Sequence, residues 1–269
     1  MCKYRMDWQD PNDDSRPIIS PRALIESYAR KHGLGSEFRV NERFLMLLTG
    51  GEDIADLKSA FEVTEEAFPL PCFLGKRPLL VIDGQPPVSL LQKTLSAPVA
   101  VDALEVAIAM GARDIFLFGL CGAFAEDVNI GDIIIPTEIK REEGCSYHYS
   151  PTGQNAKPNA ERTQALCAFL KGHDGIRLHT GTTVSTDAVF RQTLNKEISW
   201  RNKGILGVDM EMSALLTVAG FYGLPAVCML VVSDKHTLEP ETQWHWGGEE
   251  LNRNRSRAVE LLVTFIRSH

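Results

Sequence analysis

The chain has 269 residues, of which 44% are hydrophobic, so it can bury a large core, and we expect one α/β domain after a peripheral N-terminal segment. Its formal net charge of −7 argues against a nucleic acid or an anionic membrane as the partner, because both favour a basic surface. A local pocket can still oppose the overall charge and bind a small anion.

The cysteine pattern indicates free thiols in a reducing compartment, because the six cysteines are scattered and form no CxxC pair. The beginning of the sequence shows no apolar signal-peptide stretch, and no run approaches membrane-spanning length. We therefore expect a cytoplasmic protein without a membrane partner. The sequence contains no HExxH motif and no Cys/His cluster that would indicate a metal site. No predicted strand is followed by the GxGxxG motif of a dinucleotide-binding oxidoreductase.

The predicted elements alternate between strands and helices. Residues 1–40 are predicted to be an N-terminal lead-in segment that holds a short helix at 20–31, and residues 41–269 are predicted to form the α/β domain. Strands are predicted at 44–49, 79–83, 114–118, 130–136, 176–184, 205–208 and 226–234, and helices at 97–110, 161–171, 210–222 and 249–267. This order is typical of a mostly parallel sheet covered on both faces, in which ligands bind beyond the carboxyl ends of the strands.

Two acidic segments follow predicted strands. Asp209-Met210-Glu211 opens a helical run, and Ser233-Asp234 ends the next apolar run. Cleavage of an N-glycosidic bond requires two such acids in different environments, because one holds a sugar hydroxyl while the ring becomes cationic and the other protonates the leaving base. The alternative interpretation is structural. Asp209 would be a helix N-cap, Glu211 a first-turn acid favoured by the helix dipole, and Asp234 a cap of the segment that follows its strand.

These segments resemble the nucleoside phosphorylase and nucleosidase superfamily, whose ribose-binding segment reads acid-Met-Glu and whose purine-type members carry Ser-Asp at the later position. The segments SAPVAVDALEVAIAMGARDIFLFGLCGAF, NIGDIIIPTEIKREEGCSYHYSP and TTVSTDAVFRQT are also similar to that family. The resemblance spans residues 95–265. It implies an α/β fold with a central mixed, mostly parallel, barrel-like sheet flanked by helices. It also implies a homo-oligomer, either a dimer or a hexamer built as a trimer of dimers, whose neighbouring subunits complete each site.

The same resemblance implies roles for the matched residues. Glu211, with Asp209 and Met210, would hold the ribose, and Asp234 would be the general acid toward N7 of a purine. That role requires a desolvated site that raises the pKa of Asp234. The base would contact Asp234, Val189 and Phe190. The implied reaction is phosphorolysis of a purine nucleoside to free base and pentose 1-phosphate, with phosphate as co-substrate and no cofactor.

The chain departs from the family at the phosphate site. Phosphorolytic members place an Arg two residues before the glycine that corresponds to Gly119 and a Ser or Thr just after it. Here these positions hold Leu117 and Leu120, which offer phosphate no donor. A loop at 119–122 could instead provide an anion nest from the backbone N–H groups of Cys121 and Gly122.

Arg191 could also supply positive charge for phosphate. The alternative is that it is a solvated surface arginine. Without either substitute, water is the nucleophile and the protein is a nucleosidase similar to AMP or purine nucleosidases. Glu52 would then orient that water, and its alternative is a solvated acid in a turn. A nucleoside-binding protein that has lost catalysis is the third alternative.

Residues 235–248 are predicted to form a loop, which could close over the base with Trp244 or Trp246 stacking on it. Packing of these tryptophans on the domain surface is the alternative. His148, His236 and His245 are expected to be structural histidines.

Overall fold

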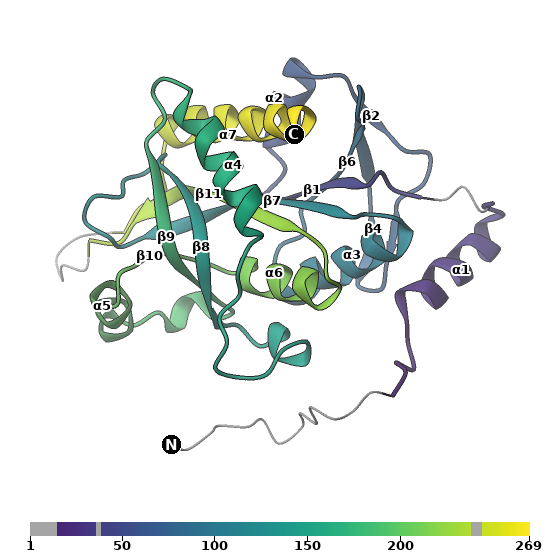
Figure 1. Ribbon diagram of the computed structural model, residues 1–269, viewed down its shortest axis with the longest axis horizontal. Helices are drawn as coiled ribbons and strands as arrows, with labels where there is room; N and C mark the ends of the chain where they lie inside the picture. The colour runs from purple at the N-terminus through teal and green to yellow at the C-terminus, as the bar shows by residue number, and fades with distance from the viewer. Residues whose placement is uncertain (1–14, 36–38, 238–243) are drawn as a thin grey trace.

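The computed structural model describes residues 15–35, 39–237 and 244–269, in which one large mixed sheet forms the centre of the molecule (Figure 1). Its strands, in sheet order, are β10 (Ile205–Asp209), β9 (Leu178–Thr186), β8 (Ile133–Glu142), β11 (Ala226–Lys235), β7 (Asp114–Ala123), β1 (Arg43–Leu48), β6 (Val88–Gln92), β5 (Leu79–Ile82) and β2 (Val63–Glu65). Because β10 also pairs with β7, the strands β7, β11, β8, β9 and β10 close into a barrel-like ring.

Strand β7 is the hub of this ring. It runs parallel to β1 and β11 and antiparallel to β10, where Gly207 lies opposite Ala123 and Val208 opposite Gly122. A Cβ atom on Gly207 would lie 2.6 Å from the carbonyl oxygen of Gly122, closer than van der Waals contact permits. The ring therefore closes only because residue 207 has no side chain.

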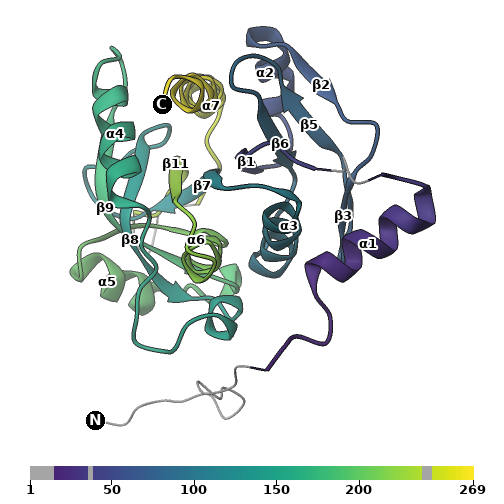
Figure 2. The same cartoon turned by 45° about the vertical axis from the view of Figure 1, so that its right-hand side comes forward.

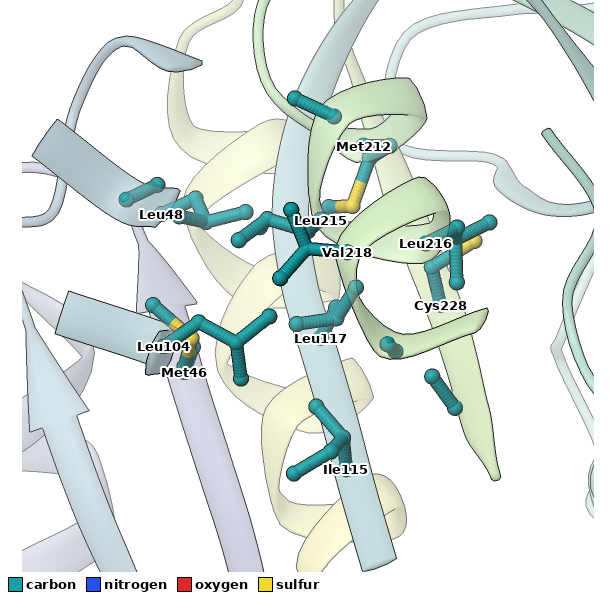
Figure 3. Close-up of a cluster of buried hydrophobic side chains, with 14 of the residues drawn as sticks. Met46, Leu48, Leu104, Ile115, Leu117, Met212, Leu215, Leu216, Val218 and Cys228 are labelled. Carbon is teal, nitrogen blue, oxygen red and sulfur yellow. The ribbon is translucent and has the colours of Figure 1, made fainter. Parts of the chain in front are cut away.

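Helices cover both faces of the sheet (Figure 2). On one face lie α3 (Ala97–Met110) and α6 (Met212–Phe221), and on the other lie α2 (Asp53–Ala60), α4 (Ala160–Lys171) and α7 (Glu249–Ser268). In Figure 3, Leu215 and Val218 of α6 lie beside Leu117 of β7, and all three side chains are fully buried. Each such leucine stabilises the fold by roughly 1.5–3 kcal/mol through removal of its apolar surface from water.

The N-terminal helix α1 (Pro21–His32) begins at Ser20, whose hydroxyl oxygen accepts the N–H of Ala23 at 3.2 Å. It has no fully buried residue, and Leu24, Ile25 and Tyr28 pack against the cluster that contains α3. The helix also lies against the hairpin of β3 (Leu70–Cys72) and β4 (Gly75–Arg77). The lead-in segment thus rests on the sheet domain through a half-buried apolar stripe.

The predicted fold class is confirmed: the chain forms an α/β domain with a mixed, barrel-like sheet between helices. The predicted loop at 119–122 is wrong, because β7 continues through Ala123 by pairing with β11 and β10. The predicted strand at 130–136 begins later and extends through Glu142, because β9 pairs along its whole length.

Several elements were absent from the prediction, among them α2, β6 and α5 (Leu194–Asn202). In β6 the polar Ser89 is buried, and its hydroxyl oxygen accepts the backbone N–H of Asn41 at 2.8 Å, so the strand lacks a continuous apolar signal.

No described helix is long and apolar enough to cross a membrane. The described cysteines are free thiols, which agrees with the expectation from their spacing.

The substitution Gly207→Ala tests the closure of the ring. We expect it to lower the free energy of unfolding by about 1–3 kcal/mol, because the new methyl group must push β10 away from β7. Gly220→Ala in α6 is the matched control, since a Cβ there meets nothing within 4 Å and alanine favours a helix. Urea denaturation of both variants measures the difference, and equal stability of the two would contradict this account of the closure.

Candidate active site

A cavity of about 770 Å³ lies at the carboxyl ends of β1, β7, β10 and β11. It brings together most of the residues singled out in the sequence, namely Cys121, Gly122, Val189, Phe190, Asp209, Met210, Glu211 and Asp234. Gly119 and Arg191 do not line it. The two acidic segments therefore face one space although they come from different strands.

Asp209 ends β10, and its side chain accepts backbone N–H groups at the beginning of helix α6. Its Oδ1 accepts the backbone N–H groups of Glu211 and Met212, both at 2.8 Å, and the hydroxyl of Ser185 at 2.8 Å. Burial raises the pKa of Asp209 to about 6 although these three donors favour the carboxylate. Asp209 is not the N-cap residue itself, which is Glu211, but its side chain fixes the backbone from which Glu211 projects.

Glu211 is buried, with 8% of its surface exposed, and its Oε1 accepts the backbone N–H of Ser96 at 2.6 Å. Ser96 has φ 79°, a left-handed conformation that is unfavourable for a residue with a side chain. Burial, followed by the negative charge of Asp209, raises the pKa of Glu211 to about 7. This carboxyl group therefore lies near the midpoint of its titration at neutral pH.

Asp234 lies at the end of β11 and has a different environment. Its Oδ2 accepts hydrogen bonds from His236 Nε2 at 2.8 Å and from Trp244 Nε1 at 2.7 Å, and Ser233 donates its hydroxyl to Oδ1. Burial alone would raise the pKa of Asp234, but the hydrogen bonds from His236, Ser233 and Trp244 outweigh it and hold the pKa below its ordinary value. The expected rise in this pKa concerns the site with substrate bound, and without substrate these three donors shift the pKa in the opposite direction.

From the sequence, His236 was expected only to be a structural histidine, and its contact with Asp234 was not predicted. Although burial opposes its charge, hydrogen bonds with Asp234 and Glu197 raise the pKa of the imidazole to about 9. A signal was present, because His236 follows Asp234 by two positions at the end of a strand and therefore points to the same side. Glu197 comes from α5 and carried no comparable signal.

The phosphate-binding groups of the family have no counterpart among the described residues that line the cavity. Leu117 is buried in the core, and Leu120 lines the cavity. Cys121 and Gly122 belong to extended strand β7, where successive N–H groups point in opposite directions, so they form no anion nest. Arg191 is exposed outside the cavity.

The other charged candidates do not replace these groups. Lys235 lines the cavity, but its Nζ donates to the carbonyl oxygens of Ala125 at 2.7 Å, Glu126 at 2.9 Å and Val128. Glu52 is exposed at the beginning of α2 and does not line the cavity. Where β1 and β7 reach the cavity, it is lined instead by apolar and small residues, such as Leu48, Thr49, Gly50 and Leu120.

Aromatic side chains surround the mouth of the cavity. Phe190 is 97% exposed, and Trp244 and Trp246 are 61% and 52% exposed with ring centroids 6.2 Å apart. Trp246 forms an isolated backbone bridge with Asp234, which returns the chain to the end of β11. The central part of the predicted lid, residues 238–243, lies outside the described residues.

Metal binding finds no support where side chains are described: no group of three or more His, Cys, Asp or Glu in those segments could hold a metal ion. His148 lies in a short 3-10 helix at Cys145–His148, and neither it nor His245 lines the cavity. Of the three histidines considered in the sequence, His236 is thus the one that the fold brings to the site.

Comparison with known proteins agrees with this geometry. The pattern of the phosphorylase superfamily matches residues 46–267, and the chain therefore belongs to that superfamily. It is 27% identical over 202 residues to the uridine phosphorylase of Escherichia coli strain K12, which covers 69% of this chain and 77% of that enzyme. It is also 27% identical over 160 residues to the DeoD-type purine nucleoside phosphorylase of Bacillus cereus, covering 59% of this chain and 66% of that enzyme.

A solved structure shows the same fold. The crystal structure of purine nucleoside phosphorylase from Toxoplasma gondii in complex with immucillin-H superposes with a TM-score of 0.75 at 18% identity. The match covers 86% of this chain and 92% of that chain. The two proteins thus share most of their architecture.

The raised pKa of Glu211 predicts a pH-dependent effect of Glu211→Gln on stability. In the wild type the unfolded state ionises near pH 4.5 and the folded state near pH 7, so the folded state loses stability relative to the variant across this interval. We expect the difference in unfolding free energy to grow by about 3 kcal/mol in favour of the variant between pH 4.5 and pH 8.

Denaturation with urea at the two pH values measures this difference. Glu65→Gln, on the exposed side of β2, is the control, and its stability should follow that of the wild type within about 0.5 kcal/mol. An equal pH response of both variants would show that Glu211 has an ordinary pKa.

Proposed function

We propose that the protein cleaves the N-glycosidic bond of a purine nucleoside by phosphorolysis, giving free base and pentose 1-phosphate. The observation that carries this proposal is the convergence of Glu211 and Asp234, with opposite pKa shifts, on one cavity. The names of the similar enzymes, which are uridine, guanosine and purine nucleoside phosphorylases, support phosphorolysis.

Glu211 is assigned to the sugar. As the C1′–N bond breaks, the ribose ring gains positive charge, and a buried carboxylate that accepts hydrogen bonds from the sugar hydroxyls stabilises that charge. Its hydrogen bond with the Ser96 N–H fixes its direction before substrate binds. Met210, which also lines the cavity, is assigned to packing against the face of the sugar, and Asp209 holds this segment in place.

Asp234 is assigned to the base. A purine leaves with the electron pair of the broken bond, and a proton delivered to its N7 prevents the build-up of negative charge. A carboxyl group at this position favours purine over pyrimidine, since a pyrimidine ring has no N7. Val189, Phe190, Trp244 and Trp246 are assigned to packing around the base, because they form the apolar mouth of the cavity.

Hydrolysis is the second candidate, favoured by the leucines at 117 and 120 and by the absence of an arginine among the described residues that line the cavity. In phosphorolysis, a neighbouring subunit must then supply the positive charge that phosphate requires. In hydrolysis, water attacks the sugar and no such charge is needed.

Base release from a panel of purine and pyrimidine nucleosides, with and without phosphate, tests the proposal. We expect release from purine nucleosides that depends on phosphate and yields pentose 1-phosphate. Glu211→Gln is expected to lower kcat/KM by roughly 10²-fold, because the stabilisation of the sugar cation is lost. Free pentose formed at equal rates with and without phosphate would establish hydrolysis, and binding without base release would show a non-catalytic protein.

A further inference from the structure

Asp234 belongs to a chain of three ionisable groups, Asp234, His236 and Glu197, and all three line the cavity. His236 Nε2 lies 2.8 Å from Asp234 Oδ2, and His236 Nδ1 lies 3.0 Å from both carboxyl oxygens of Glu197. The side chains of Glu197 and Asp234 are each 8% exposed, and that of His236 is 17% exposed. The chain therefore extends from helix α5 through the imidazole to Asp234 along the wall of the cavity.

Both ring nitrogens of His236 face carboxyl groups, which accept hydrogen bonds when ionised. Each nitrogen must then carry a hydrogen, so the arrangement itself requires a charged imidazolium between two carboxylates. The other charged group next to it on β11, Lys235, directs its ammonium toward backbone carbonyl oxygens instead. His236 is thus the group next to Asp234 that carries a transferable proton.

On the side of β7 the packing leaves no room beside the contact between His236 and Asp234. A Cβ atom on Gly122 of β7 would lie 2.8 Å from His236 Nε2 and 3.2 Å from Asp234 Oδ2. The glycine therefore lets the imidazole reach Asp234 at the floor of the cavity, where a larger residue would separate the two.

We propose that Glu197 and His236 form a proton relay, which supplies Asp234 with the proton that it then gives to the leaving base. This inference rests on the proposed N-glycosidic cleavage. His236 Nε2 gives its proton to Asp234 Oδ2, and Asp234 passes it to the base, which takes the electron pair of the broken C1′–N bond. His236 is left neutral with its remaining hydrogen on Nδ1, held by Glu197. The proton lost by the attacking hydrogen phosphate or water restores the imidazolium through solvent, so no proton is gained or lost per turnover.

In this scheme Glu197 and His236 are positioning residues, because they act through Asp234. Glu197 keeps the imidazole charged at neutral pH and selects the tautomer that remains after transfer. The relay resolves the difficulty that Asp234 rests as a carboxylate in the unliganded site although its role requires a proton.

The pH dependence of kcat in Glu197→Gln tests the relay. The amide can still hydrogen-bond the imidazole but removes the charge that keeps it protonated. We expect the loss of activity at high pH to move at least one pH unit lower than in the wild type, while activity near pH 6 stays within about threefold. Glu142→Gln is the matched control, because Glu142 binds Lys196 and Trp200 of the same helix and does not contact His236. A purely structural role of Glu197 would lower kcat at every pH without moving the profile, which would overturn the relay.

His236→Gln, tested with two substrates, separates proton delivery from misfolding. Cleavage of an ordinary purine nucleoside should fall by roughly 10²-fold or more, because the acid is no longer supplied with a proton. A purine nucleoside already methylated at N7 carries the positive charge and needs no proton, so its cleavage should change by less than about threefold. Equal losses on both substrates would overturn the relay.

An NMR titration of the His236 ring remains informative without any turnover. Its signal is assigned by its absence in His236→Gln, and we expect it to titrate near pH 9 in the wild type and lower in Glu197→Gln. An ordinary titration near pH 6.5 in the wild type would overturn the relay. Failure of the wild type to release base from any nucleoside would contradict the proposed function, whatever the titration shows.

Discussion

The pairing of β10 with β7 is the contact on which the site depends. It closes five strands into a ring and brings the end of β10, with Glu211, to the same edge as the end of β11, with Asp234. Without this closure the two strands would lie at distant positions of an open sheet, separated by β8 and β9. A single position without a side chain, Gly207 against the carbonyl of Gly122, makes the closure possible.

The three carboxyl groups at this edge are all buried, but they differ in their pKa values and in their hydrogen-bond donors. Asp209 accepts hydrogen bonds from two backbone N–H groups and one hydroxyl, and it thereby holds the backbone at the beginning of α6. Glu211 receives one backbone N–H and remains near its titration midpoint, while Asp234 faces an imidazolium and stays ionised. Burial raises the pKa of all three, and only at Asp234 do the hydrogen-bond donors outweigh it.

The alternation of apolar runs was sufficient to predict the main strands and helices and therefore the edge at which ligands bind. The long-range contacts were not predictable from these patterns. Nothing local to Gly119–Gly122 indicates that β10 will pair with this segment, so a loop was expected where the strand continues. In the same way, the acids at 211 and 234 were found from their neighbours, whereas Glu197 reaches the site only through the placement of α5.

The most direct test of the account is a crystal structure with a nucleoside analogue whose sugar cannot be cleaved from its base. We expect Glu211 to lie within hydrogen-bond distance of the sugar hydroxyls and Asp234 within hydrogen-bond distance of N7 of a purine, with His236 still hydrogen-bonded to Glu197. A ligand bound outside this cavity, or with its base on Glu211 and its sugar on Asp234, would contradict the assignment of the two acids.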